Sequence, residues 1–249
     1  MNNESLSRYV SDKLLAVDFR RYLKVASIVA TSQDPELVLD VMVFIPDRMF
    51  ECHFKLEFGD CFVIDDHDHK PPVFARFKSY GWLRSDFSKR LPIALWVFQN
   101  ATIIQDPHGS FRRLLKAQEV PFLASVESIL RRKYIEFRSE RHNLRQAVWH
   151  KDGLAIDLLR STVIKLALEM VLLSLGLPYP FKKWLPREVR KLGGRWSQFV
   201  TLQEEFLRET DPQEIITQSD IIVAEIAAIL GRRREFPEGF LQQWWLHLS

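Results

Sequence analysis

The hydrophobic pattern of this 249-residue chain changes its period near residue 120. Up to that point, apolar residues form short β-branched runs or alternate with polar residues, which is typical of strands. From Pro121 onward they recur every three or four residues, which is typical of helices that bury one face. The pattern predicts an α+β fold, with a small mixed β-sheet domain over 1–120 and an all-helical domain over 121–249.

Strands and turns alternate through the front domain. Asp34-Pro35 is a turn signal between two runs rich in β-branched residues, and Gly59-Asp60 could form a two-residue hairpin turn. On that interpretation His53–Phe58 is one strand, and 61–64 returns antiparallel to it. Strands are therefore expected at 25–31, 37–45, 53–58, 61–64, 73–77 and 93–104, the last as one strand or as two strands broken at Gln99-Asn100, and helices at 6–22 and 111–118.

The helical half carries start and stop signals. Asp211-Pro212-Gln213-Glu214 combines an N-cap residue with proline at the first helical position, and Gly231 is a matching stop. The last expected helix is short and aromatic, with Trp244 and Trp245, and we expect it to pack against the rest of the protein or to form a homodimer contact. Helices are expected at 122–148, 153–175, 186–191, 195–208, 212–230 and 238–248.

The composition excludes several classes of protein. Two cysteines provide neither a disulfide framework nor a four-ligand zinc site. The most apolar segment, 163–177, is interrupted by Lys165 and Glu169 and is shorter than the roughly 20 apolar residues that span a bilayer, so no membrane partner is expected. The N-terminus lacks the apolar core of a signal peptide, which predicts a cytoplasmic protein. A net charge of +3 barely favours nucleic acid.

Asn143-Leu144, Lys151-Asp152 and Tyr179-Pro180 in the segment 142–185, and Asp106-Pro107-His108-Gly109 in the segment 93–115, form motifs that resemble those of small bacterial nucleotidyltransferase-fold proteins. In the helical domain of that family, an Asn-Leu start, a basic-Asp pair and a Tyr-Pro-x-Lys-Lys-Trp-Leu ending recur, and 142–185 is similar. The segment 93–115 resembles the family's last strand, turn and helix, in which Asp-Pro-x-Gly precedes the helix. The matching residues of the first segment are Asn143, Leu144, Lys151, Asp152, Tyr179, Pro180, Lys183, Trp184 and Leu185.

The resemblance implies the transfer of a nucleoside monophosphate from a nucleoside triphosphate to a hydroxyl acceptor. Domains of this family hold the triphosphate with a Gly-Ser turn and use two Asp at alternate strand positions, with a third carboxylate on a neighbouring strand. Residues two apart share a strand face at about 6 to 7 Å, so paired carboxylates can hold Mg²⁺ ions that bridge the phosphates. Mg²⁺ is therefore the implied cofactor, and the acceptor could be a small molecule, a protein or RNA.

The family pattern selects candidate residues in this chain. Asp40 stands at the second carboxylate position and Val38 at the first, while Thr31-Ser32 replaces Gly-Ser and makes Ser32 the candidate residue beside the triphosphate. Glu57 is the candidate third carboxylate. Glu36 shares the face of Asp40 but would lie roughly 13 Å from it along a regular strand. The implied catalytic residues are Asp40 and Glu57, and the implied metal ligands are Asp40, Glu57 and Glu36.

Two functions remain open because Val38 cannot coordinate a metal. The first is a Mg²⁺-dependent nucleotidyltransferase that acts on a nucleoside triphosphate. The second is a degenerate homologue that keeps the scaffold and binds a nucleotide, RNA or a protein without chemistry.

Basic residues form two clusters in the helical half that could bind the phosphates of a nucleotide or RNA. Lys182 and Lys183 of the second cluster are candidates for cofactor binding. Glu136, Glu140 and Glu188 interleave with the clusters, and such mixing is typical of solvated helix faces. The clusters are Arg131-Arg132-Lys133-Arg138-Arg141-Arg145 and Lys182-Lys183-Arg187-Arg190-Lys191-Arg195.

Two further patterns, an Arg-x4-His spacing and a run of acidic and histidine residues, could be functional or could be ordinary surface features. Arg145 and His150 have the Arg-x4-His spacing that resembles the RNA-cleaving motif of small helical ribonuclease toxins, a hypothesis that requires them to meet in an exposed groove. The acidic and histidine run 65–69 contains possible metal ligands. Consecutive residues rarely converge on one ion, so a solvated loop is expected there.

Overall fold

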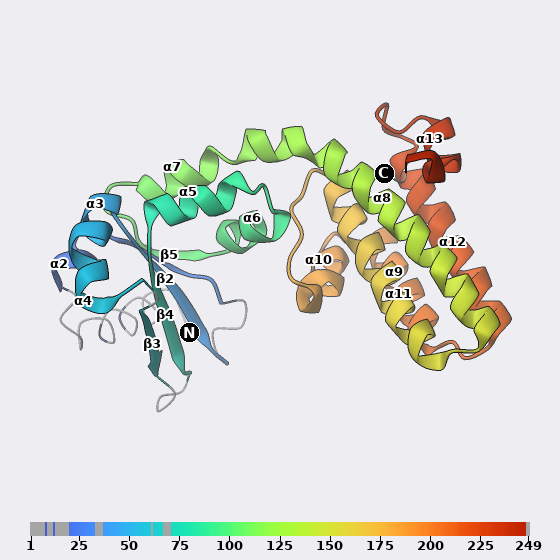
Figure 1. Ribbon diagram of the computed structural model, residues 1–249, viewed down its shortest axis with the longest axis horizontal. Coiled ribbons are helices and arrows are strands. Elements are labelled where there is room, and N and C mark those ends of the chain that lie inside the picture. The colour runs from blue at the N-terminus through green and yellow to red at the C-terminus, as the bar shows by residue number, and fades with distance from the viewer. Residues whose placement is uncertain are drawn as a thin grey trace. The chain divides into compact units, whose positions relative to one another are not determined.

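The computed structural model of this chain describes Arg8, Asp12 and residues 20–32, 37–60, 62–66 and 71–247. The chain divides into two compact units, Met1–Phe122 and Leu123–Ser249. The first unit contains a mixed β-sheet with helices and the second is helical, so the predicted α+β class is confirmed (Figure 1).

Five strands form the sheet of the first unit, in the order β3-β4-β2-β1-β5. β2 and β4 run parallel, with Leu39 opposite Val73 and Ile45 opposite Ser79, and the other neighbours are antiparallel. The two central strands therefore end at the same edge of the sheet, where their carboxyl ends can position side chains together. The strands are β1 (Ser27–Ala30), β2 (Leu39–Ile45), β3 (Val63–Asp66), β4 (Val73–Ser79) and β5 (Thr102–Gln105).

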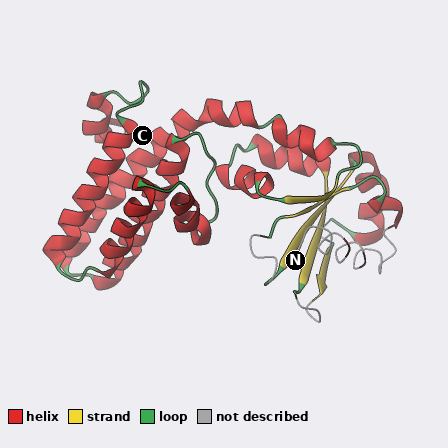
Figure 2. Ribbon diagram, turned by 180° about the vertical axis from the view of Figure 1, so that it is seen from behind, coloured by secondary structure: helices red, strands yellow, loops and turns green. Residues whose placement is uncertain are grey.

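Helices cover both faces of this sheet (Figure 2). Alternate residues of β2, such as Val41 and Val43, pack on one face with Phe54, while Phe44 packs on the other face with Phe111. This alternation follows from the period of two along a strand. The first face is covered by α2 (Arg20–Leu23), α3 (Asp47–Met49), the π-helix η1 (Phe50–Phe54) and α4 (Lys55–Phe58). The second is covered by α5 (Tyr80–Ser88), α6 (Pro92–Gln99) and α7 (Ser110–Lys116).

The strand predicted at 53–58 is wrong, because this segment is helical. Phe50, Phe54 and Phe58 recur every four residues, and their rings pack in series with centroids 5.4 and 5.0 Å apart. Leu56, which the alternating pattern placed on the buried face, is 81% exposed. The four-residue spacing of the phenylalanines thus outweighs the alternation of apolar and polar residues. β3 pairs with β4, and the expected hairpin between 53–58 and 61–64 does not form.

The strand predicted at 93–104 is also largely wrong. Pro92 occupies the first turn of α6, whose buried side chains include Leu95 and Phe98, and only Thr102–Gln105 forms a strand. The helix α5 was not predicted, although Ser79 is a favourable N-cap residue and its side chain accepts a hydrogen bond from Trp82 N at 3.0 Å. The remaining strands at 25–31, 37–45 and 73–77 and the helix at 111–118 are confirmed within a few residues. The helix expected at 6–22 lies mostly outside the described residues.

The second unit is built from long helices, as the three- and four-residue spacing predicted. Asp211 caps α12, because its Oδ1 accepts hydrogen bonds from Gln213 N and Glu214 N, each at 2.9 Å. Gly231 is the C-cap residue of the same helix, so both predicted signals are confirmed. The helices are α8 (Glu119–His150), α9 (Gly153–Ser174), η2 (Lys182–Trp184), α10 (Leu185–Lys191), α11 (Arg195–Arg208), α12 (Pro212–Leu230), α13 (Glu238–Gln242) and η3 (Trp244–His247), of which α8 begins before the unit boundary.

Among the described residues, no helix combines the length and the apolar character that a bilayer crossing requires.

Candidate functional site

Asp40 lies near the start of β2, with its side chain 38% exposed. Its backbone amide donates a hydrogen bond to Ser32 Oγ at 2.6 Å, and its carbonyl oxygen accepts one from Thr31 N at 2.8 Å. The structure therefore brings together two of the residues selected from the sequence, Asp40 and Ser32. Ser32 acts there as the hydrogen-bond acceptor for the backbone amide of Asp40, near the start of β2.

The side chains that share the sheet face of Asp40 include no second carboxylate among the described residues of β1 and β4. Phe74 lies directly opposite Asp40 on β4, and Arg76 lies one position further along the same face. Arg76 Nη2 is 3.3 Å from Asp40 Oδ1, so the charge of Asp40 is already met by a guanidinium. A guanidinium thus already lies beside the carboxylate that a divalent ion would have to use.

Glu57 is remote from Asp40, because it lies on the helical layer over the opposite face of the sheet. It pairs with Arg21 and accepts a hydrogen bond from Tyr22 Oη at 3.0 Å, and Tyr22 belongs to the core on that face. The structure does not bring Asp40 and Glu57 together. The reason is the helical conformation of 50–58, since the predicted strand would have placed Glu57 in the sheet.

The remaining sequence-selected residues do not complete a metal site. Glu36 lies outside the described residues, and Lys182 and Lys183 are exposed on η2 of the second unit. No group of three or more His, Cys, Asp and Glu side chains that could hold an ion occurs in the described part of the chain. The described donors around Asp40 therefore do not fit a pair of Mg²⁺ ions.

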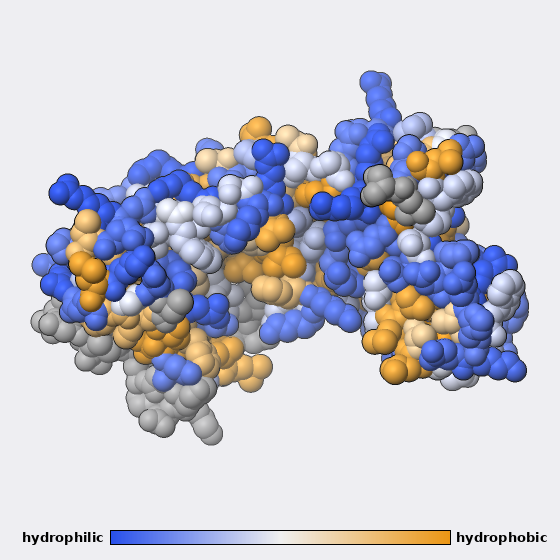
Figure 3. All heavy atoms as spheres, viewed as in Figure 1, coloured by the Kyte–Doolittle hydropathy of each residue, from blue (hydrophilic) through white to orange (hydrophobic). Residues whose placement is uncertain are grey.

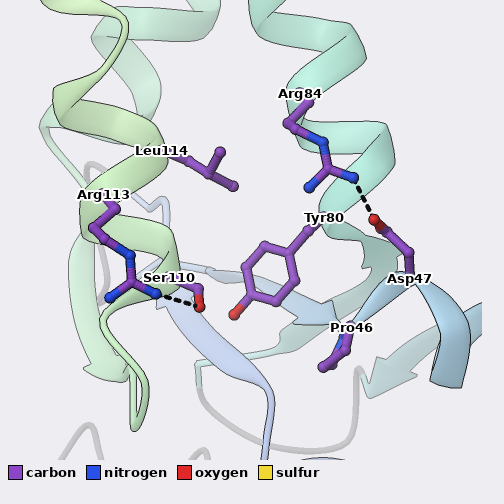
Figure 4. Close-up of a pocket in the computed structure, with 7 residues that line it drawn as sticks. All are labelled: Pro46, Asp47, Tyr80, Arg84, Ser110, Arg113 and Leu114. Carbon is purple, nitrogen blue, oxygen red and sulfur yellow. Dashed lines mark hydrogen bonds and ion pairs between the residues drawn. The ribbon is translucent and has the colours of Figure 1, made fainter.

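A pocket of about 400 Å³ lies at the other end of β2 (Figure 4). Seven residues separate Asp40 from Asp47, which corresponds to roughly 20 Å along an extended chain. The pocket forms where β2 continues into α3 and β4 continues into α5, with α7 as its third wall. It is lined by Pro46, Asp47, Tyr80, Arg84, Ser110, Arg113 and Leu114.

The charged residues that line the pocket are two arginines, Arg84 and Arg113, and one aspartate, Asp47. Asp47 pairs with Arg84 and also accepts a hydrogen bond from Gly81 N. A side chain at position 81 would crowd this contact, because a Cβ there would lie 3.1 Å from Asp47 Oδ1. Arg113 donates to His108 O at 2.7 Å and to Ser110 Oγ at 3.2 Å, and it pairs with none of the carboxylates that the structure describes. The positive charge of Arg113 is therefore available to an anionic ligand.

A buried network holds the floor of the pocket. Ser27 Oγ donates to Asp106 Oδ1 at 2.6 Å, so Tyr80 Oη must donate to Ser27 Oγ, at 2.5 Å. Asp106 also accepts hydrogen bonds from the amides of Phe111 and Arg112 at 3.3 and 3.2 Å, and its side chain has no exposed surface. The network links the starts of β1, α5 and α7.

The network also sets two pKa values. Burial works against the charged form of Asp106, but the hydrogen bonds from Ser27 and the two backbone amides outweigh it and hold the pKa of this carboxyl below its ordinary value. Burial raises the pKa of Tyr80 above its ordinary value. The Tyr80 hydroxyl therefore stays protonated at neutral pH, and it points towards Ser110 in the pocket (Figure 4).

The sequence contained only part of this arrangement. The sequence marks Asp106 only as the first residue of an Asp-Pro-x-Gly motif. The fold brings Ser27 and two backbone amides to its carboxylate, which accepts a hydrogen bond from each of them. Asp47 and Arg84 were not predicted. They lie 37 residues apart, and only the parallel pairing of β2 and β4 brings the ends of these strands together.

The ribonuclease-like pair does not converge. Arg145 and His150 both lie on α8, and five residues turn a helix through about 140°, so their exposed side chains point in different directions. Of the acidic run at 65–69, Asp65 and Asp66 belong to β3 and the rest lies outside the described residues.

Apolar surface is present on the second unit. Trp244 packs against it, with Arg138 Cζ 5.6 Å from its ring centroid, while Trp245 is 52% exposed. Trp149, Leu154 and Leu158 are 78, 73 and 62% exposed where α8 turns into α9, and Figure 3 shows hydrophobic atoms gathered at that end of the unit. A homodimer contact stays a prediction.

Comparison with known proteins gives likenesses in structure and none in sequence. No protein-family model and no curated protein sequence matches the chain. The crystal structure of a nucleotidyltransferase-like protein from Exiguobacterium sibiricum 255-15 is similar, with a TM-score of 0.51 and 12% identity, covering 99% of this chain and 80% of that one. At this identity the likeness shows the fold alone, and the fold is that of a nucleotidyltransferase-like protein.

Proposed function

We propose that this protein uses a nucleotidyltransferase-like fold to bind a nucleotide without Mg²⁺, and that it does not transfer a nucleoside monophosphate. The observation that carries this proposal is the contact of Arg76 with Asp40 at 3.3 Å, on a sheet face where neither neighbouring strand supplies a second described carboxylate. Two-metal transfer needs several carboxylates that converge on the ions. Here one carboxylate is neutralised by an arginine.

The pocket at the carboxyl ends of β2 and β4 is the proposed nucleotide site. Its volume of about 400 Å³ falls in the range of small-molecule sites, about 300 to 1,000 Å³. Arg113 presents a charge that no described carboxylate meets, and guanidinium groups suit phosphate because they can donate two parallel hydrogen bonds. Tyr80, Leu114 and Pro46 supply less polar walls for the rest of the ligand.

Calorimetric titration of the full chain with ATP, GTP, CTP and UTP, in Mg²⁺ and in EDTA, tests this proposal. We expect one or more of the nucleotides to bind with the same affinity in both buffers. Arg113→Ala should weaken binding at least about tenfold, because a hydrogen bond to a charged group contributes about 1.5 to 3 kcal/mol. Asp40→Ala should leave the affinity unchanged, since Asp40 lies at the other end of β2.

Lys116→Ala is the matched control for Arg113→Ala, because it removes one exposed charge from the same helix without touching the pocket lining. Binding that requires Mg²⁺ and is lost in Asp40→Ala would contradict the proposal and restore the transferase hypothesis. Equal loss in the two α7 variants would show that general charge, not the pocket, attracts the nucleotide.

A further inference from the structure

The two basic clusters of the helical unit differ in what their side chains already contact. In the first cluster, Arg131, Lys133 and Arg141 form ion pairs with carboxylates, and Arg138 donates to Leu241 O at 3.1 Å. These four cations are engaged in holding α8 to the rest of its unit. Of this cluster, only Arg132 and Arg145 are exposed without an ion pair to a described carboxylate.

In the second cluster, three cations lack an ion pair with a carboxylate among the described residues. Lys182, Lys183 and Arg195 are exposed and form no ion pair with any carboxylate that the structure describes. The other three members pair with Glu188 or Glu204. Residues 181–196 contain six cations and one carboxylate, a net charge of +5, whereas the whole chain carries +3.

Aromatic rings lie directly beneath these cations. Arg187 Cζ and Lys183 Nζ lie 4.1 and 5.0 Å from the ring centroid of Trp184. Arg195 Cζ lies 4.0 Å from the ring centroid of Trp196. Both tryptophans are half-buried, and so is Arg187, whereas Lys183 and Arg195 are exposed beside these rings.

The two rings and their three cations belong to one continuous segment, which consists of η2, α10 and the start of α11 (Figure 1). α11 begins against the end of α10, where Ser197 Oγ donates to Arg190 O at 3.3 Å and Trp196 N donates to Gly193 O at 3.1 Å. We call this segment the Lys182–Trp196 surface. Its positions are therefore fixed relative to one another within the second unit.

We propose that the Lys182–Trp196 surface binds single-stranded nucleic acid, with phosphates on Lys182, Lys183 and Arg195 and bases stacked on the Arg–Trp pairs. Cations alone would attract any polyanion. Guanidinium planes and aromatic rings add a preference for unpaired bases, whose faces are free to stack, whereas a duplex hides them. An acidic peptide would use the cations and leave the rings without a role.

This inference does not rest on the proposed nucleotide site, which lies in the first unit. Fluorescence anisotropy of the full chain with a fluorescein-labelled 12-mer of uridine, the matching 12-mer of thymidine and a 12-base-pair RNA duplex tests it. The uridine 12-mer should bind much more tightly than the duplex. Equal binding of the thymidine 12-mer assigns single strands of either kind, and weaker binding of it assigns RNA.

Charge and stacking can be separated by variants. For the wild type, three phosphate contacts predict a slope of about −2 in a plot of log K against log salt concentration. Lys182→Glu/Lys183→Glu should make this slope shallower and weaken binding of the uridine 12-mer at least about tenfold. Trp196→Leu should weaken binding about fivefold or more without changing that slope, because it removes a stacking ring and no charge. Circular dichroism should show unchanged helicity in each variant.

Arg232→Glu/Arg234→Glu is the matched control, because it reverses two exposed charges elsewhere in the same unit. This control should retain the wild-type affinity within about threefold. The proposal is overturned if the control loses as much affinity as Lys182→Glu/Lys183→Glu, if the duplex binds as tightly as the uridine 12-mer, or if no binding occurs at 50 mM salt, where about three phosphate contacts should be strongest.

Discussion

Replacing Glu169 by Gln should lower the free energy of unfolding by about 3 to 5 kcal/mol, the usual cost of removing one partner from a buried ion pair. Glu169 and Lys133 form such a pair between α9 and α8, and they are 2% and 8% exposed. Burial favours the neutral form of Lys133, but the adjacent Glu169 carboxylate outweighs it and holds the pKa of Lys133 above its ordinary value. Glutamine fills the same space and leaves the lysine charge without its partner.

Urea unfolding followed by circular dichroism measures this loss. The double variant Lys133→Met/Glu169→Leu is the control, and it should lie within about 1 kcal/mol of the wild type or above it, because packed apolar residues replace a buried pair with little cost. Lys165, whose Nζ is 3.7 Å from Glu169 Oε1, is half exposed, and Lys165→Ala should cost less than about 1 kcal/mol. A double variant as unstable as Glu169→Gln would show that side-chain shape, not charge pairing, accounts for the loss.

Replacing Asp106 by Asn should lower the free energy of unfolding by about 2 to 3 kcal/mol at pH 7, because hydrogen bonds to a charged group contribute about 1.5 to 3 kcal/mol. The Asp106 carboxylate accepts bonds from Ser27 and from two backbone amides at the start of α7, and an asparagine side chain offers only one oxygen for them. The loss should also loosen Tyr80 and Ser110, which line the pocket.

The effect of Asp106→Asn should depend on pH in a direction that its pKa fixes. The folded-state pKa of Asp106 is lowered, so its stabilisation is fully present above the unfolded pKa of about 4 and is lost as the pH falls through the folded value. The difference in unfolding free energy between wild type and variant should therefore be largest at neutral pH and shrink below about pH 4. Asp60→Asn, at an exposed ion pair with Lys55, should change stability by less than about 0.5 kcal/mol throughout. A constant difference from pH 7 to pH 3 would contradict an ionised Asp106.

The helical half of the fold was predictable because its signals are local. Helix periodicity, the Asp211 cap and the Gly231 stop all act within one or two turns of chain, and the structure confirms them. Phe50, Phe54 and Phe58 show the opposite case in the front half. Their four-residue spacing favours a helix, whereas the alternation of apolar and polar residues over 53–58 favours a strand. Packing of Phe54 against Tyr22 and Phe77 stabilises the helix.

The candidate site was less predictable because it depends on contacts between distant segments. Asp40 could be selected from the strand that carries it, but its partner Arg76 is 36 residues away and becomes visible only through the parallel pairing of β2 and β4. The same pairing brings Asp47 to Arg84 and creates the pocket. The family pattern selects carboxylates as metal ligands, so it does not point to Arg76 or Arg84.

Chain-local patterns were enough to predict the α+β class and the helical second half, since each depends on neighbouring residues or on a period along the chain. A missing first carboxylate at Val38 is what the family resemblance implies, and it does not follow from that periodicity. Tertiary structure was needed to separate Asp40 from Glu57 and to pair Asp40 with Arg76. It also decided that Lys182, Lys183 and Arg195 form no ion pair with a carboxylate in the described part of the chain. Those outcomes depend on which side chains meet across the sheet and between helices, and charge pairing at distances of a few ångströms is set by packing rather than by order in the chain.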